Sequence, residues 1–362
     1  MNSSTSLNVD QDIELPTIKA GKSVVLVLLG MGVYLAYLYH VGFEDIGDSL
    51  RRVNLVVFSV ALLLSLMDVV FNALSWNKLI EQFDFRISFI DVFLIYMSSI
   101  FLNNIIPSGS VSGETARVYF LDKIAENARF DSTSATVAAT RVITAMPFVM
   151  GMSAGLVYLV FYFQVPSWAV TTCFTMIFLI VSVGVIFLGV CMVENWLQRI
   201  VNVVIDQIEK VFHWNVDRNL CHVITHQFHR SMNVLRGKNS ALIISSFWAF
   251  LGWLSLNLVA FLAFRSLGVK VPILAIFAVY SVAIVFQTLP LVLPGGVGLI
   301  EILMTALFTA VGIPLHDAAA VTILSRLAQL WFHTLLGGMA TAYLVRRVSL
   351  LAKKTVSAEG TL

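Results

Sequence analysis

The chain has 362 residues, of which 58% are hydrophobic and only 12% are charged. A soluble domain carries about 25% charged residues, so this composition excludes an ordinary water-soluble globule. The net charge of +2, with basic residues scattered between apolar blocks, gives no reason to expect a nucleic-acid partner. Because the apolar blocks are about as long as the ~20 residues that cross a bilayer core, the sequence predicts an all-α polytopic membrane protein.

Six apolar blocks are long enough to be full membrane spans. A polar tail, residues 1–22, precedes them and lacks the basic start and apolar stretch of a signal peptide. Two further apolar stretches, 88–106 and 272–293, each run into a loop of Pro, Gly or Ser and then a second short apolar helix. We expect each to form a re-entrant or broken helical hairpin that returns to the side it entered, although two pairs of full spans would also fit. The six predicted full spans are 23–42, 54–76, 134–163, 167–192, 241–264 and 318–345.

Positively charged residues give the predicted orientation, because Lys and Arg are retained on the cytoplasmic side. With the N-terminus inside, sixteen of the 23 Lys and Arg residues fall in inside segments and four in outside segments. We therefore expect a multi-pass protein of the cell membrane with both termini in the cytoplasm, the second within a tail of residues 348–362.

The one substantial polar region of the sequence, residues 193–240, is expected at the cytoplasmic surface. Trp196, Ile200 and Val203 follow helical spacing there, which is typical of an amphipathic helix lying in a membrane interface. A partner protein or a second copy of the chain would bind through this region.

A long-period duplication relates the two halves of the chain. The loops Pro107 to Glu114 and Pro294 to Glu301 both read Pro-x-Gly-x4-Glu, at an offset of 187 residues. Each loop follows a span that carries an asparagine and precedes a span that carries an arginine, and these partners are offset by 185 residues. The partners are Asn72 with Asn257 and Arg141 with Arg326.

The two units enter the predicted membrane from opposite sides. The first, about 54–163, enters from outside, and the second, about 241–345, enters from inside. The units are therefore predicted to be inverted repeats, an arrangement of secondary transporters that bind substrate near the midplane between the repeats.

Two arginines are predicted to lie near the middle of the membrane. Arg141 and Arg326 each lie ten residues inside the expected helix starts at Asp131 and His316, or about 15 Å at 1.5 Å per residue. A hydrocarbon core is about 30 Å thick, and a charge at its centre costs at least ~2.5 kcal/mol, so it needs a partner or a pathway. The alternative is that each helix begins later and its arginine reaches the membrane interface.

The two glycine-containing loops are predicted to bind an anion together with these arginines. A half-helix that begins at such a loop directs backbone N–H groups and a positive dipole end into the protein, and an arginine fork matches phosphate geometry. Glu114 and Glu301 open the second helices, where a carboxylate also caps backbone N–H groups. Arg117 follows Glu114 by three residues and would neutralise it. Met304 takes that place in the second half, which leaves Glu301 as the freer carboxylate.

Further polar residues complete the candidate substrate site. Asn103 and Asn104 before the first loop, and Gln287 before the second, either line a polar path or satisfy backbone groups of the broken helices. Asp68 has no acidic counterpart in the second unit, and it would carry a coupling proton, form a salt bridge or lie at an interface. The loop residues assigned to the same site are Pro107, Gly109, Pro294, Gly295, Gly296 and Gly298.

The two loops also carry a family resemblance. The segment from Leu102 to Arg117, LNNIIPSGSVSGETAR, resembles the first signature of a flippase-like membrane family related to the transmembrane half of lysylphosphatidylglycerol synthases. The segment from Leu289 to Glu301, LPLVLPGGVGLIE, resembles its second signature. The resemblance implies a single transmembrane domain, residues 23–347, of the lipid flippase type, acting on phospholipids or polyprenyl-phosphate-linked sugars. The sequence has no segment like the aminoacyltransferase half, so lysyl transfer is not expected.

Together these features predict a flippase or secondary transporter for a lipid with an anionic head group, and not an enzyme. The residues alone fit a small organic anion equally well, because the lipid substrate rests on the resemblance. A further alternative is a membrane-embedded enzyme or accessory subunit of lipid-linked glycan or phospholipid biosynthesis. The sequence has no P-loop, dinucleotide fingerprint or convincing metal-ligand set, so we expect no cofactor and no metal.

Overall fold

The computed structural model describes residues 20–106, 108, 111–162, 167–212, 218–288 and 294–359. These residues are almost wholly helical, as predicted, and contain no β-strand beyond an isolated bridge between Arg86 and Glu126. In chain order the helices are α1 (Ala20–Val41), α2 (Phe43–Arg51), α3 (Leu55–Ile80), α4 (Phe89–Ile105), α5 (Val111–Ile124), α6 (Phe130–Tyr162), α7 (Ser167–Met192), α8 (Glu194–Phe212), α9 (Arg218–Arg236), α10 (Asn239–Ser266), α11 (Ile273–Thr288), the 3-10 turn η1 (Pro294–Gly296), α12 (Leu299–Ala310), α13 (Leu315–Arg326), the π-helical segment η2 (Leu327–Trp331) and α14 (Phe332–Glu359).

Four helices in the described part of the chain are long and apolar enough to cross a membrane. They are α3, α6, α10 and the continuous stretch from α13 to α14, Leu315–Leu351, and they confirm four of the predicted spans. Helices also form at the other two predicted positions, as α1 and α7. In α1 the apolar part of the described residues is the shorter Leu28–Tyr39. Helix α7 has 26 residues, but its stretch Ile177–Met192 qualifies as a span only together with Glu194–Gln207 of α8. The total of six full spans therefore remains a prediction.

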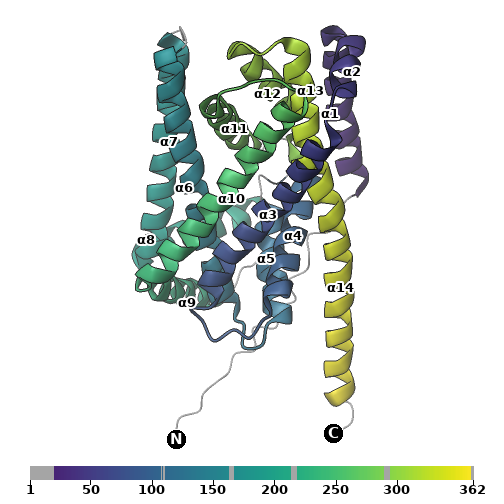
Figure 1. The fold of residues 1–362 in the computed structure, drawn as a ribbon. Helices are drawn as coiled ribbons and strands as arrows, with labels where there is room; N and C mark the ends of the chain where they lie inside the picture. The colour runs from purple at the N-terminus through teal and green to yellow at the C-terminus, as the bar shows by residue number, and fades with distance from the viewer. Residues whose placement is uncertain are drawn as a thin grey trace, which may run out of the picture.

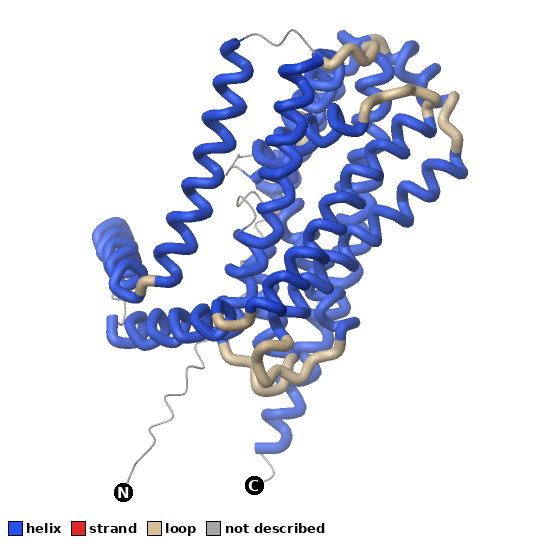
Figure 2. The backbone as a smooth tube through the Cα atoms, turned by 60° about the vertical axis from the view of Figure 1, so that its left-hand side comes forward, coloured by secondary structure: helices blue, strands red, loops and turns tan. Residues whose placement is uncertain are grey.

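The polar region 193–240 divides into two helices, α8 and α9, rather than forming one. The chain bends by 102° between α7 and α8, so α8 runs across the end of the bundle instead of continuing along it. Helix α9 also lies across this end (Figures 1 and 2). Exposed Trp196, Ile200, Val203 and Val204 repeat along α8, as the helical spacing predicts.

Two helical hairpins occupy the interior of the bundle (Figure 1). The first hairpin is α4 with α5, and the second is α11, η1 and α12. Their helices have 17, 14, 16 and 12 residues, each shorter than the ~20 of a full span. The bridge between Arg86 and Glu126 holds the start of α4 beside the end of α5, at the end of the molecule where α9 lies. The second hairpin enters from the other end, beside α2 and α13 (Figure 1).

Each hairpin packs against a long helix of the other half of the chain. Helix α4 lies along α14, and α11 lies along α6, while α3 and α10 form the most extensive pairing. Glycines permit the close approach: a Cβ at Gly337 would lie 2.5 Å from the Met97 carbonyl oxygen, and one at Gly155 would lie 2.5 Å from Cα of Ala278. Small residues at such contacts are typical of helix packing in membranes.

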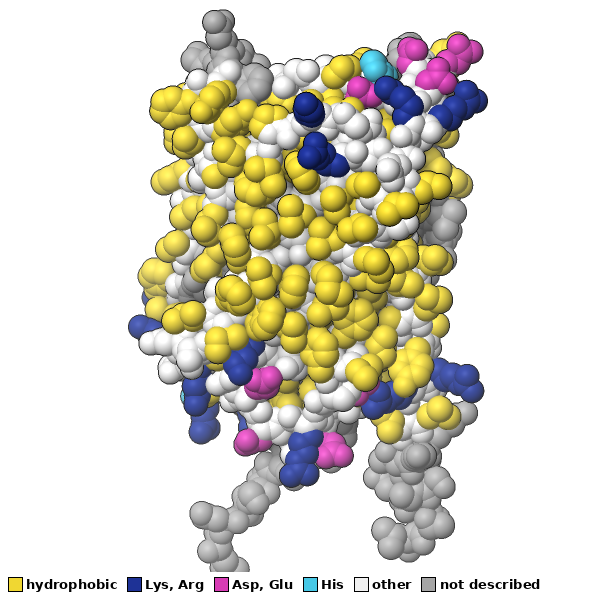
Figure 3. Space-filling view, in the orientation of Figure 1, with side chains coloured by type: hydrophobic (Ala, Val, Ile, Leu, Met, Phe, Trp, Pro, Cys, Tyr) yellow, Lys and Arg dark blue, Asp and Glu magenta, His cyan; other side chains and the backbone are white. Residues whose placement is uncertain are grey.

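Charged residues gather toward the two ends of the molecule, and hydrophobic side chains cover the broad band between them (Figure 3). Large apolar side chains of the long helices are exposed in this band, among them Leu63 of α3, Phe161 of α6 and Phe247 of α10. A water-soluble surface does not carry so large an apolar area. The band is therefore the surface that the lipid bilayer covers.

Candidate functional site

A buried ion pair lies in the second half of the chain, between α12 and α13. Nε of Arg326 donates to Oε1 of Glu301 at 2.6 Å, and Nη2 donates to the Gly295 carbonyl oxygen at 2.8 Å. The other carboxylate oxygen, Oε2, accepts from the Gly298 backbone N–H at 2.7 Å. The two side chains are only 7% and 4% exposed. Each charge thus has its partners inside the protein, as a buried charge requires.

The glycines of the second hairpin shape this site. Gly295, Gly296 and Gly298 have φ of 59°, 66° and 91°, a region that residues with a Cβ rarely enter. This backbone directs the Gly298 N–H and the Gly295 carbonyl toward the ion pair. A Cβ at Gly298 would lie 2.3 Å from the carbonyl oxygen of Gly30 in α1, so the loop is also fixed against α1.

The first half contains the corresponding ion pair in a looser form. Nε of Arg141 lies 3.3 Å from Oε1 of Glu114, and the two side chains are 41% and 27% exposed. Oε1 of Glu114 has no hydrogen-bond partner. The prediction that Glu301 is the freer carboxylate is therefore wrong: Glu301 is fully bonded by Arg326 and Gly298, and Glu114 is the freer one.

Arg117 does not neutralise Glu114 through an ion pair, in contrast to the prediction from their spacing. Its guanidinium carbon lies 5.4 Å from the ring centre of Trp76 and 5.2 Å from that of Tyr96. The side chain is buried, with 6% exposure, and neither Nε nor Nη1 has a hydrogen-bond partner. Rotation of the side chain toward the two rings explains the difference, because α-helical spacing brings residues three apart near each other without fixing their rotamers.

The polar residues before the first loop satisfy groups within the chain. Oδ1 of Asn103 accepts from the Gly113 backbone N–H at 2.6 Å, and Oγ of Ser108 accepts from the Ser112 N–H at 2.9 Å. These two donors at the start of α5 are therefore occupied. Nδ2 of Asn104 donates to Oγ1 of Thr334 in α14 at 2.8 Å, which ties the first hairpin to the other half. Two predicted loop residues, Pro107 and Gly109, lie outside the described residues.

The tips of the two hairpins meet inside the protein. A Cβ at Gly295 would lie 3.4 Å from the Asn104 carbonyl oxygen and 3.7 Å from its Cα. Pro294 and Gly296 are buried beside Gly295, and Gln287 is half-buried in the last turn of α11. The structure thus brings residues of the two predicted loops into one region.

Asp68 lies in α3, four residues before Asn72, and interacts electrostatically with Tyr96 of α4. Nδ2 of Asn72 donates to Oδ1 of Asp68 at 2.7 Å, and a Cβ at Gly252 of α10 would lie 2.5 Å from that same Nδ2. This carboxylate is therefore held by an amide rather than by a salt bridge.

Sequence reasoning missed two features beside the second ion pair. Helix α13 gives way to the π-helical segment η2 directly after Arg326, and Gln329 in that segment donates to the Leu256 carbonyl oxygen of α10 at 2.8 Å. Such π segments often mark functional sites.

The second missed feature is Tyr34 of α1. It interacts electrostatically with Glu301 and Arg326, and its buried hydroxyl has no hydrogen-bond partner among the described residues. No sequence signal pointed to α1, because it lies outside the duplicated units.

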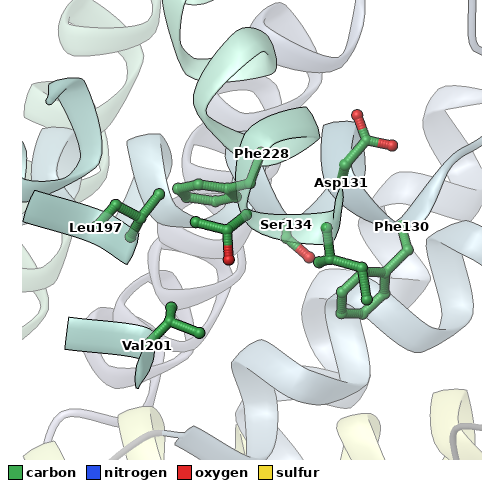
Figure 4. A pocket seen from close by; sticks show the side chains of 8 residues that line it. Phe130, Asp131, Ser134, Leu197, Val201 and Phe228 are labelled. Atoms are coloured by element: carbon green, nitrogen blue, oxygen red, sulfur yellow. The ribbon is translucent and has the colours of Figure 1, made fainter. Parts of the chain in front are cut away.

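A separate pocket of about 250 Å³ lies between the start of α6 and helices α8 and α9 (Figure 4). Its lining is almost wholly apolar, and the carboxylate of Asp131 at its side accepts from Oγ of Ser231 at 2.9 Å. Asp131 lies ten residues, or ~15 Å along the helix, before Arg141. The pocket is lined by Phe130, Asp131, Ser134, Leu197, Val201, Ile224, Thr225 and Phe228.

Comparison with known proteins places this geometry in a family. The model of the lysylphosphatidylglycerol synthase TM region matches residues 23–337. A UPF0104 membrane protein of Pyrococcus horikoshii is 26% identical over 88% of this chain and 96% of its own length. Similar proteins of the same description from Methanothermobacter thermautotrophicus and Methanocaldococcus jannaschii are 24% and 26% identical, each over 91% of this chain and 97% of their own length. The chain is therefore a membrane protein of the family defined by the lysylphosphatidylglycerol synthase TM region.

Proposed function

We propose that this protein is a secondary-type flippase that moves a lipid with an anionic, phosphate-bearing head group across the cell membrane. The observation that carries the proposal is the occurrence of two Arg-Glu ion pairs, each between a helix of a hairpin and a long helix. An arginine fork binds phosphate through two parallel hydrogen bonds, so an incoming phosphate would replace the carboxylate on the same guanidinium. The released carboxylate would then take a proton or another partner.

An inverted-topology duplication is part of the proposal. The first hairpin packs on α14 and the second on α6, so each half places its hairpin on the arginine helix of the other. Asn72 and Asn257 each donate to the carbonyl oxygen four residues earlier, at 2.9 and 2.7 Å. Both the packing and the asparagine bonds are expected of two units related by a two-fold axis in the membrane plane. Rocking of such units exposes a central site to alternate sides of the membrane.

The different states of the two ion pairs support such a cycle. The second-half pair is closed, with both side chains less than a tenth exposed. The first-half pair is longer and partly exposed. We assign this conformation to a step in which the first-half arginine is available to substrate and the second-half arginine is held by Glu301. Asp68 remains our candidate for the coupling proton.

A lipid rather than a small organic anion is supported by the family. The matching family is named for a synthase of lysylphosphatidylglycerol, a lipid that contains a phosphodiester. The end of the molecule that carries α8 and α9 would face the cytoplasm, together with both termini, because most Lys and Arg residues of the connections lie at this end.

The test is lipid translocation by the purified full chain in proteoliposomes. A fluorescent phosphatidylglycerol in the outer leaflet is bleached by dithionite, so the unbleached fraction measures its movement between leaflets. We expect Arg141→Ala and Arg326→Ala each to slow translocation at least about tenfold, since each removes charged hydrogen bonds. Arg265→Ala is the matched control, because Arg265 is exposed and stacks only on Phe261. Translocation at the unmodified rate in both test variants would overturn the proposal.

A further inference from the structure

Arg117 is a buried cation whose hydrogen-bonding groups are left open. Its side chain is 6% exposed, and Nε and Nη1 have no partner. Buried charged groups in proteins are normally paired and hydrogen-bonded. The described residues therefore supply no acceptor for two buried N–H donors of this arginine.

Two aromatic rings stabilise the charge of Arg117 without accepting its hydrogen bonds. Its guanidinium carbon lies 5.4 and 5.2 Å from the ring centres of Trp76 and Tyr96, distances at which a cation is attracted to an aromatic face. Trp76 is fully buried, and its Nε1 donates to Oγ1 of Thr136 in α6 at 3.2 Å, which fixes the ring. The two ring centres are 6.5 Å apart, so both rings lie toward one side of the guanidinium, and neither supplies an acceptor for its N–H donors.

The charged groups around Arg117 differ from those at the equivalent place in the second half. Glu114 and Arg141 are its charged neighbours, and both of them, with Asp68, also act on the adjacent Tyr96. Oε1 of Glu114 has no hydrogen-bond partner among the described residues. In the second half Met304 takes the place of Arg117 and is buried, and there Arg326 and Glu301 balance each other. The first half therefore carries a buried cation, Arg117, at a position where the second half has an apolar side chain.

We infer that Arg117 and Arg141 form an oxyanion subsite for a phosphate group, and that the two halves of the molecule bind substrate unequally. Arg117 is the fixed donor, held by Trp76 and Tyr96. Arg141 is the exchanging donor, which leaves Glu114 when the phosphate arrives. The second half provides a closed ion pair without an extra cation. This inference rests on the proposed function and adds the residue that retains the head group.

The test is phosphate binding by the full chain in an uncharged maltoside detergent, measured by isothermal titration. One arm uses inorganic phosphate and the other uses dihexanoyl phosphatidic acid, so that a free anion and a lipid head group are distinguished. We expect Arg117→Met, which copies the residue of the second half, to weaken binding at least about tenfold, because two charged hydrogen bonds are lost. Arg265→Met is the matched control, since it removes an exposed arginine that also stacks on a ring, and it should bind as the unmodified chain does.

Unchanged affinity in Arg117→Met, an equal loss in Arg265→Met, or no binding of either ligand by the unmodified chain would overturn the inference. If Arg117→Met does not fold, Arg117→Lys is tested in its place. Lysine keeps the charge but lacks the planar guanidinium, so we expect this variant to bind phosphate several-fold more weakly than the unmodified chain. Binding of phosphate alone that depends on Arg117 retains the subsite and contradicts the lipid substrate. If lipid translocation depends on Arg141 and Arg326 but not on Arg117, the inference is wrong and the proposed function is not contradicted.

Discussion

Two ion pairs of the same chemistry occupy opposite environments in this molecule. The pair of Glu301 with Arg326 is short and buried, whereas the pair of Glu114 with Arg141 is longer and partly exposed. Removing one member of a buried pair leaves an uncompensated charge and costs about 3–5 kcal/mol. An exposed pair contributes about 0–1 kcal/mol. The two carboxylates should therefore differ in what they do for stability.

We expect Glu301→Gln to lower the free energy of unfolding by about 3–5 kcal/mol and Glu114→Gln to lower it by less than about 1 kcal/mol. Unfolding in mixed micelles, followed by circular dichroism, measures both variants. Glu114→Gln is the matched control, since it makes the same chemical change at the same position of the other unit. Equal destabilisation by the two substitutions would contradict the difference that we assign to burial.

Side-chain partners were the least predictable part of the candidate site. The spacing and the duplication singled out Glu114, Glu301, Arg141 and Arg326 as site residues, but not their pairing into two ion pairs. The partner of Arg117 and the bonded state of Glu301 depend on rotamers and on the path of the loop. Those in turn depend on glycines with positive φ and on rings from another helix, which no local pattern encodes.

Helix α9 is fixed to the start of α6 by a buried carboxylate. Asp131, which is 5% exposed, accepts from Oγ of Ser231 at 2.9 Å, from Oγ of Ser132 at 3.1 Å, and from Nε and Nη2 of Arg129, both at 3.1 Å. Ser231 is the α9 residue in this set. A hydrogen bond to a charged group contributes about 1.5–3 kcal/mol, so one hydroxyl contributes much of the polar attachment of α9.

We expect Ser231→Ala to loosen α9 without unfolding the bundle. Backbone amides of α9 should exchange with deuterium about tenfold faster or more, because the lost bond to a buried carboxylate favours local opening. Hydrogen exchange with mass spectrometry measures this effect. Asn233→Ala is the matched control on the same helix, since Asn233 is exposed and its side chain bonds His229 of the same helix. Exchange in α9 that stays slow would show that apolar packing alone holds this helix.

Hydropathy predicted the cores of the long helices well and their ends less well. The predicted span 54–76 is observed as Leu55–Ile80, and 241–264 as Asn239–Ser266. Polar caps decide the ends, as where the Asn54 side chain accepts from the N–H groups of Val56 and Val57. The π-helical segment η2 was not predictable, because neither α13 nor η2 contains a Pro or Gly. Its Gln329 bonds α10, a contact that the local sequence does not encode.

At the scale of the whole molecule, the hairpins link the two halves. Asn104 of the first hairpin bonds Thr334 of α14, and the tip of the second hairpin reaches Asn104. A shift of one half would therefore move both ion pairs. The all-helical class and the family were predictable from composition and from the two loop signatures. The exchange of hairpins between halves was not, because periodicity within one segment does not report which distant segment it packs against.

The proposed inverted topology predicts that equivalent positions of the two units lie on opposite sides of the membrane. Lys123 and Ala310 are such positions, since they are offset by 187 residues and both are exposed. In a chain whose three cysteines are replaced by serine, we expect Lys123→Cys to react with a membrane-impermeant maleimide only in inside-out vesicles. Ala310→Cys should react only in intact cells, and the cysteine-free chain is the control. Labelling of both positions from the same side would remove the inverted relation, and with it the basis for alternating access through the two ion pairs.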